Sequence, residues 1–123
     1  MAVYQYYEYS DLRYAGLESG EALIGKGMMA YWLPVLSLGE VHSCTSHSGT
    51  LYVTDRRVFF RTMWNGYVEF ELRLPEIRGF SVRRRGLFTQ VTIHSWEGEK
   101  LWFTGFSAKR MQGWLRRAGV GAL

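Results

Sequence analysis

Three side chains that could bind a metal or act as a nucleophile lie close together in the sequence, at His42, Cys44 and His47. Imidazole and thiolate groups suit zinc, but a tetrahedral site needs a fourth donor, which would have to come from the distant His94. A nucleophilic cysteine would need an orienting acid beside its base, and this segment holds only Glu40. We therefore expect a protein that is not an enzyme and that holds no metal and no cofactor.

Positive charge is concentrated in the second part of the chain. Residues 1–48 carry 2 cations and 5 acids, a net charge of −3, whereas residues 49–123 carry 13 and 6, a net charge of +7. Arginine supplies 12 of the 15 cations and binds anions through a planar fork. Cations near an anionic membrane contribute about 1 kcal/mol each, so such a site also needs an apolar contact. The predicted anion- or lipid-binding residues are Arg78, Arg83, Arg84 and Arg85.

An apolar run before residue 39 is the candidate for that second contact. Between Pro34 and Gly49 the sequence predicts a loop of about sixteen residues, which is long for a compact domain. The run either packs on the body of the protein, joins a second copy, or enters a membrane interface. Packing or self-association is the favoured reading. The predicted interaction loop comprises Tyr31, Trp32, Leu33, Val35, Leu36 and Leu38.

The elements that position these groups follow from the period of the apolar residues. From residue 49 onward, short alternating segments are separated by turn residues, which is typical of an all-β protein. Asn65-Gly66 is the strongest hairpin signal, because both residues tolerate a positive φ. The predicted strands span residues 22–33, 50–54, 57–63, 67–74, 77–84, 87–96 and 99–104.

Alternation within these strands predicts which side chains face the core. In residues 67–74 the apolar side chains are predicted inward, and Glu69 and Glu71 outward. Arg57 is likewise predicted on the outer face of its strand. Leu87 is predicted on the same face of its strand as Val91 and Ile93.

One amphipathic helix is predicted to close the chain. Ser107 is the expected N-cap, and Phe106 before it is expected to pack on Met111 as a hydrophobic staple. Apolar residues then recur at helical spacing up to Ala118. Gly113 lies inside the helix and lowers its stability by about 1 kcal/mol relative to alanine.

The order of these elements, with a long first strand, six further strands and one helix, is similar to that of a PH-like domain. Residues 17–21, LESGE, resemble the leader of bacterial PH-like and GRAM domains. Residues 49–60, GTLYVTDRRVFF, resemble the GRAM hairpin with its tight Asx-Arg-Arg turn, and residues 74–77, LPEI, resemble the corner between the sheets. The resemblance covers about residues 17–118 and departs from compact members in the long apolar loop.

The resemblance implies a mainly β fold, a partly open barrel of about seven antiparallel strands in two orthogonal sheets, with one C-terminal α-helix. It also implies a non-catalytic module that binds membrane lipids or protein segments. The basic motif of phosphoinositide-binding members is absent, since the first strand and its loop carry only Lys26, so inositol-phosphate specificity does not carry over. The implied organisation is a Tyr-rich extension over residues 1–16, the domain over 17–119 and a tail over 120–123.

Length and composition agree with one globular domain. The chain has 123 residues, 47% of them hydrophobic, and no uncharged apolar stretch near the roughly 20 residues that a membrane helix needs. A single cysteine excludes an internal disulfide and fits a reducing cytoplasm. Residues 10–19 could form a short helix. We expect a cytoplasmic protein, at the inner membrane face if it binds lipid.

Three functions stay open at this point. The favoured one is a module for protein–protein contact, including self-association, through the predicted interaction loop. The first alternative is peripheral binding of anionic lipid head groups through the arginine-rich turn. The least favoured is nucleic-acid binding by a basic β-surface, where aromatic rings would stack on bases.

Overall fold

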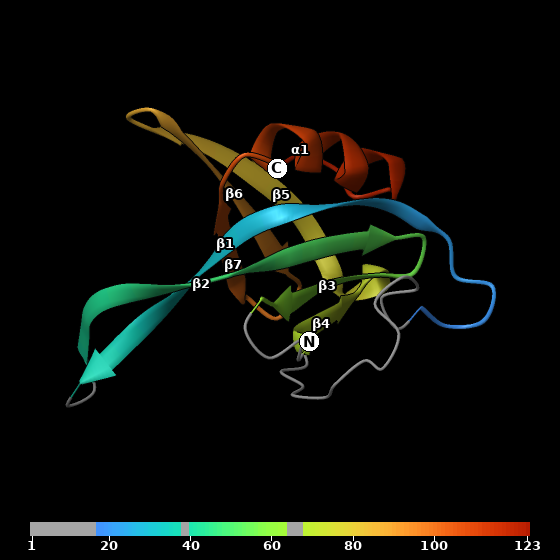
Figure 1. Cartoon of the computed structure of the whole chain (residues 1–123). Coiled ribbons are helices and arrows are strands. Elements are labelled where there is room, and N and C mark those ends of the chain that lie inside the picture. Colours follow the sequence, from blue (N-terminus) through green and yellow to red (C-terminus); the bar gives the residue numbers. More distant parts are fainter. Residues whose placement is uncertain (1–16, 38–39, 64–67) are drawn as a thin grey trace.

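The computed structural model describes residues 17–37, 40–63 and 68–123, and it describes the backbone but not the side chains of residues 33–37, 40–45 and 85. Seven antiparallel strands and one C-terminal helix follow one another along this part of the chain, so the predicted fold class is confirmed (Figure 1). A 3-10 turn at Leu74–Glu76 separates the fourth strand from the fifth. The elements are β1 (Leu23–Ser37), β2 (Glu40–Thr54), β3 (Arg57–Thr62), β4 (Val68–Arg73), β5 (Ile77–Arg85), β6 (Phe88–Ser95), β7 (Lys100–Thr104) and α1 (Ala108–Arg117).

The strands form one sheet in the order β4-β3-β2-β1-β7-β6-β5. The long strand β1 is shared, because it pairs with β2 along most of its length and with β7 at residues 30–32. The two sheets expected from the sequence are therefore two halves of one continuous sheet that meet at β1. Strands β4 and β5 form its two edges, which leaves the barrel partly open, and α1 packs on β1 and β6 (Figure 1).

The main hydrophobic core draws side chains from all seven strands and from α1. Tyr31 of β1 lies near its centre, with ring centroids 5.6 Å from Phe60, 5.0 Å from Phe70 and 5.3 Å from Phe103. Aromatic pairs at such separations contribute beyond their buried area. Since these four rings come from four different strands, they hold the two halves of the sheet together.

The predicted loop between Pro34 and Gly49 is wrong, because β1 continues to Ser37 and β2 begins at Glu40. The register pairs Pro34 with Cys44 and continues along both strands, so the segment is a long hairpin (Figure 1). The sequence prediction ended the first strand at residue 33, just before this proline. Pro34 lies beyond residues 30–32, where β1 pairs with β7, and a strand edge tolerates a proline.

The outward prediction for Glu69 and Glu71 is also wrong, since these residues are only 1% and 9% exposed. The ladder between β3 and β4 shifts its register beside Glu69, which is the extra residue of a bulge. The second face of this half of the sheet carries its own small apolar cluster, formed by Tyr52, Phe59 and Val68. Alternation assigns side chains to a face, but it does not reveal that both faces are covered.

Helix α1 is anchored by Trp114, whose indole lies against β1 at Gly25. A Cβ atom built on Gly25 would come within 2.4 Å of the Trp114 ring, so only glycine lets the helix approach this closely. Met111 and Leu115 are fully buried on the same side of the helix. The predicted amphipathic helix is confirmed, and its buried face explains the glycine in the middle of a strand.

Gly113 offers a stabilising substitution. It is exposed within α1, and no atom lies within 4 Å of a Cβ built there. We expect Gly113→Ala to raise the free energy of unfolding by about 0.5–1 kcal/mol, because alanine loses less backbone entropy in a helix. Urea denaturation of the two proteins measures the difference, and an unchanged or lower midpoint would contradict the expectation.

The last residues are part of the fold rather than a free tail. The amide of Phe80 in β5 donates to the carbonyl of Gly121 at 3.0 Å, and the amide of Leu123 donates to the carbonyl of Phe80 at 2.8 Å. Val120 is buried in the main core. These bonds lie near the middle of β5, on the edge that does not pair with β6. The end of β5 that leads into the turn to β6 lies beyond them.

Some expectations lie outside the described residues. They are the Tyr-rich extension over residues 1–16, the turn at Asn65-Gly66 and most of the possible helix over residues 10–19. Residues 17–19 of that segment are not helical.

Candidate functional site

The hairpin between β5 and β6 ends in a mixed basic and apolar turn. Arg83 and Arg84 are exposed at the end of β5, where Arg83 pairs with Gln90 of β6. The turn passes through Gly86, whose φ of 63° suits a residue without a side chain. Leu87 follows it and is 94% exposed. A single exposed leucine is common on a protein surface, and only a patch of exposed apolar residues marks an interaction site.

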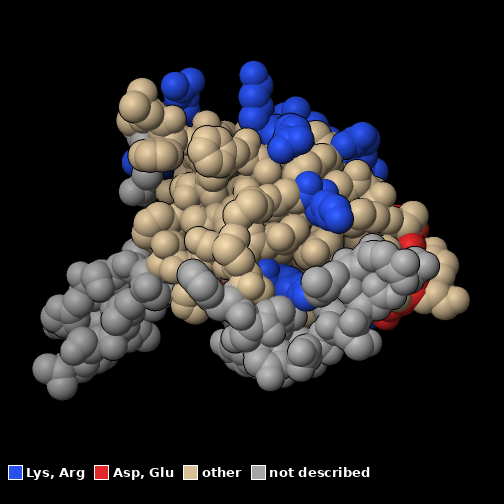
Figure 2. Space-filling view, in the orientation of Figure 1, with Lys and Arg blue, Asp and Glu red and all other residues tan. Residues whose placement is uncertain are grey.

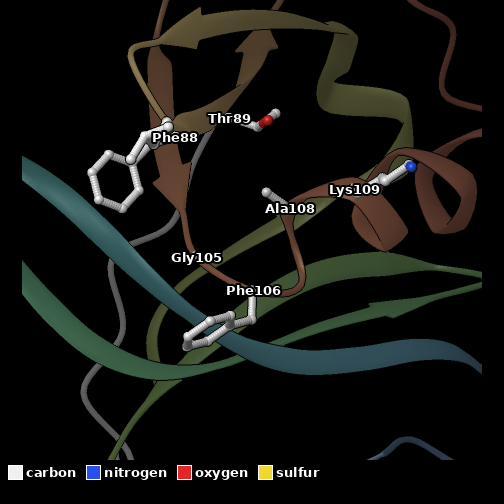
Figure 3. A pocket seen from close by; sticks show the side chains of 7 residues that line it. Phe88, Thr89, Gly105, Phe106, Ala108 and Lys109 are labelled. Carbon is white, nitrogen blue, oxygen red and sulfur yellow. The ribbon is translucent and has the colours of Figure 1, made fainter.

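Further exposed residues beside this turn come from the start of β6 and from the connection between β7 and α1. Phe88, the first residue of β6, is 67% exposed, and Phe106, just before α1, is fully exposed at 101%. Figure 3 shows both phenyl rings projecting to the same side, with Gly105 between them. Lys109 of α1 borders the same region. We call Arg83, Arg84, Leu87, Phe88, Phe106 and Lys109 the tip surface.

A groove of about 350 Å³ runs through the tip surface. It lies between the first residues of β6 and the chain that leads into α1 (Figure 3). Its lining residues are Leu87, Phe88, Thr89, Gly105, Phe106, Ala108 and Lys109.

Three sequence predictions are wrong at or beside the tip surface. Leu87 was expected on one face with Val91 and Ile93, but it lies in the turn, before β6 begins, where strand alternation does not apply. Phe106 was expected to pack on Met111, yet Met111 is fully buried in the core while Phe106 is fully exposed. The expected side-chain cap at Ser107 is absent too, because this residue is buried and makes no such bond. Sequence reasoning therefore missed three apolar members of the surface.

The charge distribution places the positive excess in the half of the chain that carries the tip surface. Residues 49–76 hold 4 cations and 4 acids, whereas residues 77–123 hold 9 cations and only 2 acids, a net charge of +7. Both acids, Glu97 and Glu99, lie near the turn between β6 and β7, at the end of β6 away from Phe88. In Figure 2 the Lys and Arg side chains gather along the edge formed by α1 and the β5–β6 hairpin.

The predicted anion-binding arginines do not all come together. Arg78 lies near the other end of β5, five residues from Arg83, which is roughly 16 Å at 3.3 Å per residue. Its guanidinium lies 6.0 Å from the ring centroid of Trp96. Arg85 pairs with Phe88 through the backbone, and its side chain is outside the described part.

The predicted interaction loop is a strand, and its first residue belongs to the core. Tyr31 is only 3% exposed. Trp32 is half-buried on the opposite face, and its Nε1–H donates to Thr104 Oγ1 at 2.7 Å. Leu33, Val35 and Leu36 lie in β1 without described side chains, and Leu38 lies outside the described residues. The run is thus divided between the two faces of a strand.

The two histidines with described side chains, His47 and His94, each pair with one other side chain. His47 Nδ1 bonds Glu69 Oε1, and burial raises the pKa of that carboxyl although the bond to His47 opposes the shift. His94 Nε2 lies 2.7 Å from Ser81 Oγ, and burial, with the cations Lys100 and Arg78, lowers the pKa of His94. Within the described ranges, no group of three His, Cys, Asp or Glu side chains could hold a metal ion.

A network of carboxylates and arginines joins the leader before β1 to strands β3 and β4. Arg57 donates from Nε and Nη2 to Glu21, at 2.8 and 2.9 Å, and from Nη1 to Glu71 at 2.5 Å. Burial opposes ionisation of Glu21, but the bonds from Arg57 and Thr54 outweigh it and lower its pKa. These groups saturate one another, so the network is a structural element rather than a site.

A neighbouring ion pair between Glu18 and Arg73, whose Nη2 also lies 3.7 Å from Glu71 Oε1, predicts acid sensitivity. Hydrogen bonds from Arg73 lower the pKa of Glu18 to about 2, against an unfolded value of 4.5. Because the folded pKa is the lower one, the stabilisation is complete above about pH 5 and is lost as the pH falls towards 2. We expect urea midpoints to fall between pH 5 and pH 3, and to fall less steeply in Glu18→Gln. Equal slopes for the two proteins would contradict this assignment.

The architecture described above is a partly open β-barrel closed by one C-terminal helix. No protein-family model and no curated protein matches the sequence. Among solved structures, the chain is similar to the C-terminal domain of an unknown protein from Leishmania infantum, with a TM-score of 0.62 and 14% sequence identity, over 81% of this chain and 85% of that one. A likeness at this identity extends to the fold alone. Over the described residues, no helix has the length and apolar character needed to span a membrane.

Proposed function

We propose that this protein is a non-enzymatic PH-like module of the GRAM type that binds anionic membrane surfaces through its tip surface. One observation carries the proposal: Leu87, Phe88 and Phe106 are 94%, 67% and 101% exposed beside Arg83, Arg84 and Lys109. Apolar side chains that enter the interfacial region, flanked by cations that meet the head groups, are the pattern of peripheral membrane binding.

The free energies that the two kinds of contact contribute favour a membrane contact that uses both the cationic and the apolar side chains. Three cations near an anionic surface contribute about 3 kcal/mol in total, which gives only marginal binding. Complete burial of a leucine or phenylalanine side chain contributes about 1.5–3 kcal/mol. Partial insertion of three such side chains therefore adds at least as much as the charges, and the two together meet the usual need for two membrane signals.

Two alternatives compete with this proposal. Self-association through residues 31–38 is weakened by the burial of Tyr31 and by the bond of Trp32 to Thr104, since neither side chain is free to join a common apolar face. Nucleic-acid binding would share the salt dependence of the arginines and would use the exposed rings of Phe88 and Phe106, but it gives the exposed Leu87 no role, because this side chain has no flat ring on which a base could stack. The membrane proposal uses all six residues of the tip surface.

Vesicle co-sedimentation tests the proposal with a matched pair of variants. Phe88 and Trp96 are 67% and 68% exposed and lie at opposite ends of β6. We expect the wild-type protein to pellet with anionic but not neutral vesicles, and more strongly at low salt. Phe88→Ser is expected to bind about tenfold more weakly, the equivalent of about 1.4 kcal/mol, and Trp96→Ser as the wild type does.

Three results would contradict the membrane proposal, and each points to a different conclusion. Absence of pelleting, together with a mass in light scattering that is a multiple of 14.3 kDa, would favour self-association instead. Binding of a single-stranded oligonucleotide in place of vesicles would favour the nucleic-acid alternative. An equal loss in both serine variants would show that the tip surface is not the contact.

A further inference from the structure

The tip surface contains a concave groove, whereas a surface that only inserts side chains into a bilayer would be convex. Its walls are the rings of Phe88 and Phe106, which are carried by β6 and by the segment before α1, with Gly105 between them (Figure 3). The two walls are held apart because β6 and α1 are both anchored in the main core through Val91 and Met111. The rings therefore leave a gap between them instead of packing on one another.

A flat bilayer surface would not fill this gap. Apolar walls that lack partner atoms on one side lose their dispersion contacts, and water in the groove would contact mainly Leu87, Phe88, Phe106 and the methyl group of Ala108. A flexible hydrocarbon chain would supply those contacts. The volume of about 350 Å³ is at the lower end of the range for small-molecule sites, so it suits one chain rather than two.

The positive charge around the groove favours an anionic head group. Lys109 is the one charged residue among those that line it. Arg84 lies close by, because its register partner is Thr89, another lining residue. The sequence has no acidic residue between positions 77 and 96 or between 100 and 123. An anionic head group at the groove is therefore attracted by Lys109 and Arg84.

We propose that the groove between β6 and the start of α1 binds one alkyl chain that carries an anionic head group, with the chain between Phe88 and Phe106 and the head group at Lys109. The proposal deepens the membrane function proposed above and rests on it for the source of the chain, a lipid of the anionic surface. The groove then holds one chain of an anionic membrane lipid.

The first test uses wild-type protein and n-alkyl phosphates of six to twelve carbons, each below its micelle concentration, in titration calorimetry. We expect affinity to rise about fourfold for each added methylene until the groove is full, and then to level off. An alkyl phosphocholine of equal length is expected to bind at least tenfold more weakly. A rise without a plateau, or no preference for phosphate, would overturn the proposal.

The second test fills the groove. Thr89 lines it, whereas Gln90 is the next residue and lies on the opposite face of β6. We expect Thr89→Trp to weaken decyl phosphate binding at least tenfold and Gln90→Trp to leave it unchanged, with circular dichroism as the check on folding. Equal affinities in the two variants would overturn the proposal, and if Thr89→Trp does not fold, the chain-length series decides.

The two proposals fail separately. If the wild type pellets with anionic vesicles but does not bind decyl phosphate, the groove assignment is wrong and the membrane function stands. If it binds decyl phosphate with a chain-length plateau but never pellets, the membrane function is wrong and the groove remains the site of a soluble amphiphile. If Thr89→Trp keeps vesicle binding and loses decyl phosphate binding, both proposals are supported.

Discussion

Arg57→Leu is expected to lower the free energy of unfolding by about 3–5 kcal/mol, the typical effect of removing one partner from a buried ion pair. Arg57 is 3% exposed and binds both Glu21 and Glu71, which are also buried. Its guanidinium also lies 4.4 Å from the ring centroid of Phe59. Removal leaves two carboxylates without their cation in a region that excludes water. Urea denaturation at pH 7 measures the loss.

The matched control is Arg73→Ala. Arg73 also binds a glutamate, with its two terminal nitrogens 2.8 and 2.7 Å from the carboxylate oxygens of Glu18, but both side chains of this pair are 39% exposed. We expect a loss below about 1 kcal/mol, because water and salt screen an exposed pair. Equal losses for the two variants would mean that burial is not what makes the Arg57 network important.

The double variant R83E/R84E is expected to weaken binding to anionic vesicles at least 100-fold at low salt. Each cation contributes about 1 kcal/mol near such a surface, and reversal adds repulsion of similar size, so the upper limit is about 4 kcal/mol. Arg83 and Arg84 are exposed at the end of β5, so the change should leave the thermal midpoint nearly unaltered. Co-sedimentation at two salt concentrations measures the effect.

The control for this variant is R78E/K100E. It changes the net charge by the same amount, but Arg78 lies near the start of β5 and Lys100 at the start of β7, both away from the β5–β6 turn. A local contact predicts nearly wild-type vesicle binding for R78E/K100E. If both double variants lose binding equally, overall charge rather than the tip surface attracts the membrane, and the proposed site is wrong.

Much of the fold could be predicted because its signals are local. Alternation and turn residues located β3 to β7 within a few residues, and helical spacing located α1 through Met111, Trp114 and Leu115. These patterns depend only on residues close together in the sequence, so they can be recognised without knowing which other element packs on the segment. The extent of β1 and β2 was missed at Pro34, whose effect depends on whether another strand lies beside it.

The candidate site was predicted only in part. Arg83 and Arg84 were found as a charge cluster, because a run of arginines is readable in any fold. Leu87 was placed on one face with Val91 and Ile93, and Phe106 was expected to pack on Met111, but both are exposed. Whether an apolar residue at the end of an element is covered depends on the surrounding chain, so no local pattern could have corrected this assignment.

The sequence by itself determined the fold class, the helix and the separation of charge, because residues 77–123 carry a net charge of +7 in any conformation. Only the tertiary structure decided that Arg57, Glu69 and Glu71 are buried, that Tyr31 is a core residue, and that Leu87 lies beside a groove. The physical reason is the same in each case. Burial and exposure are set by contacts between segments distant in sequence, which the curled sheet brings together and the order of residues does not display.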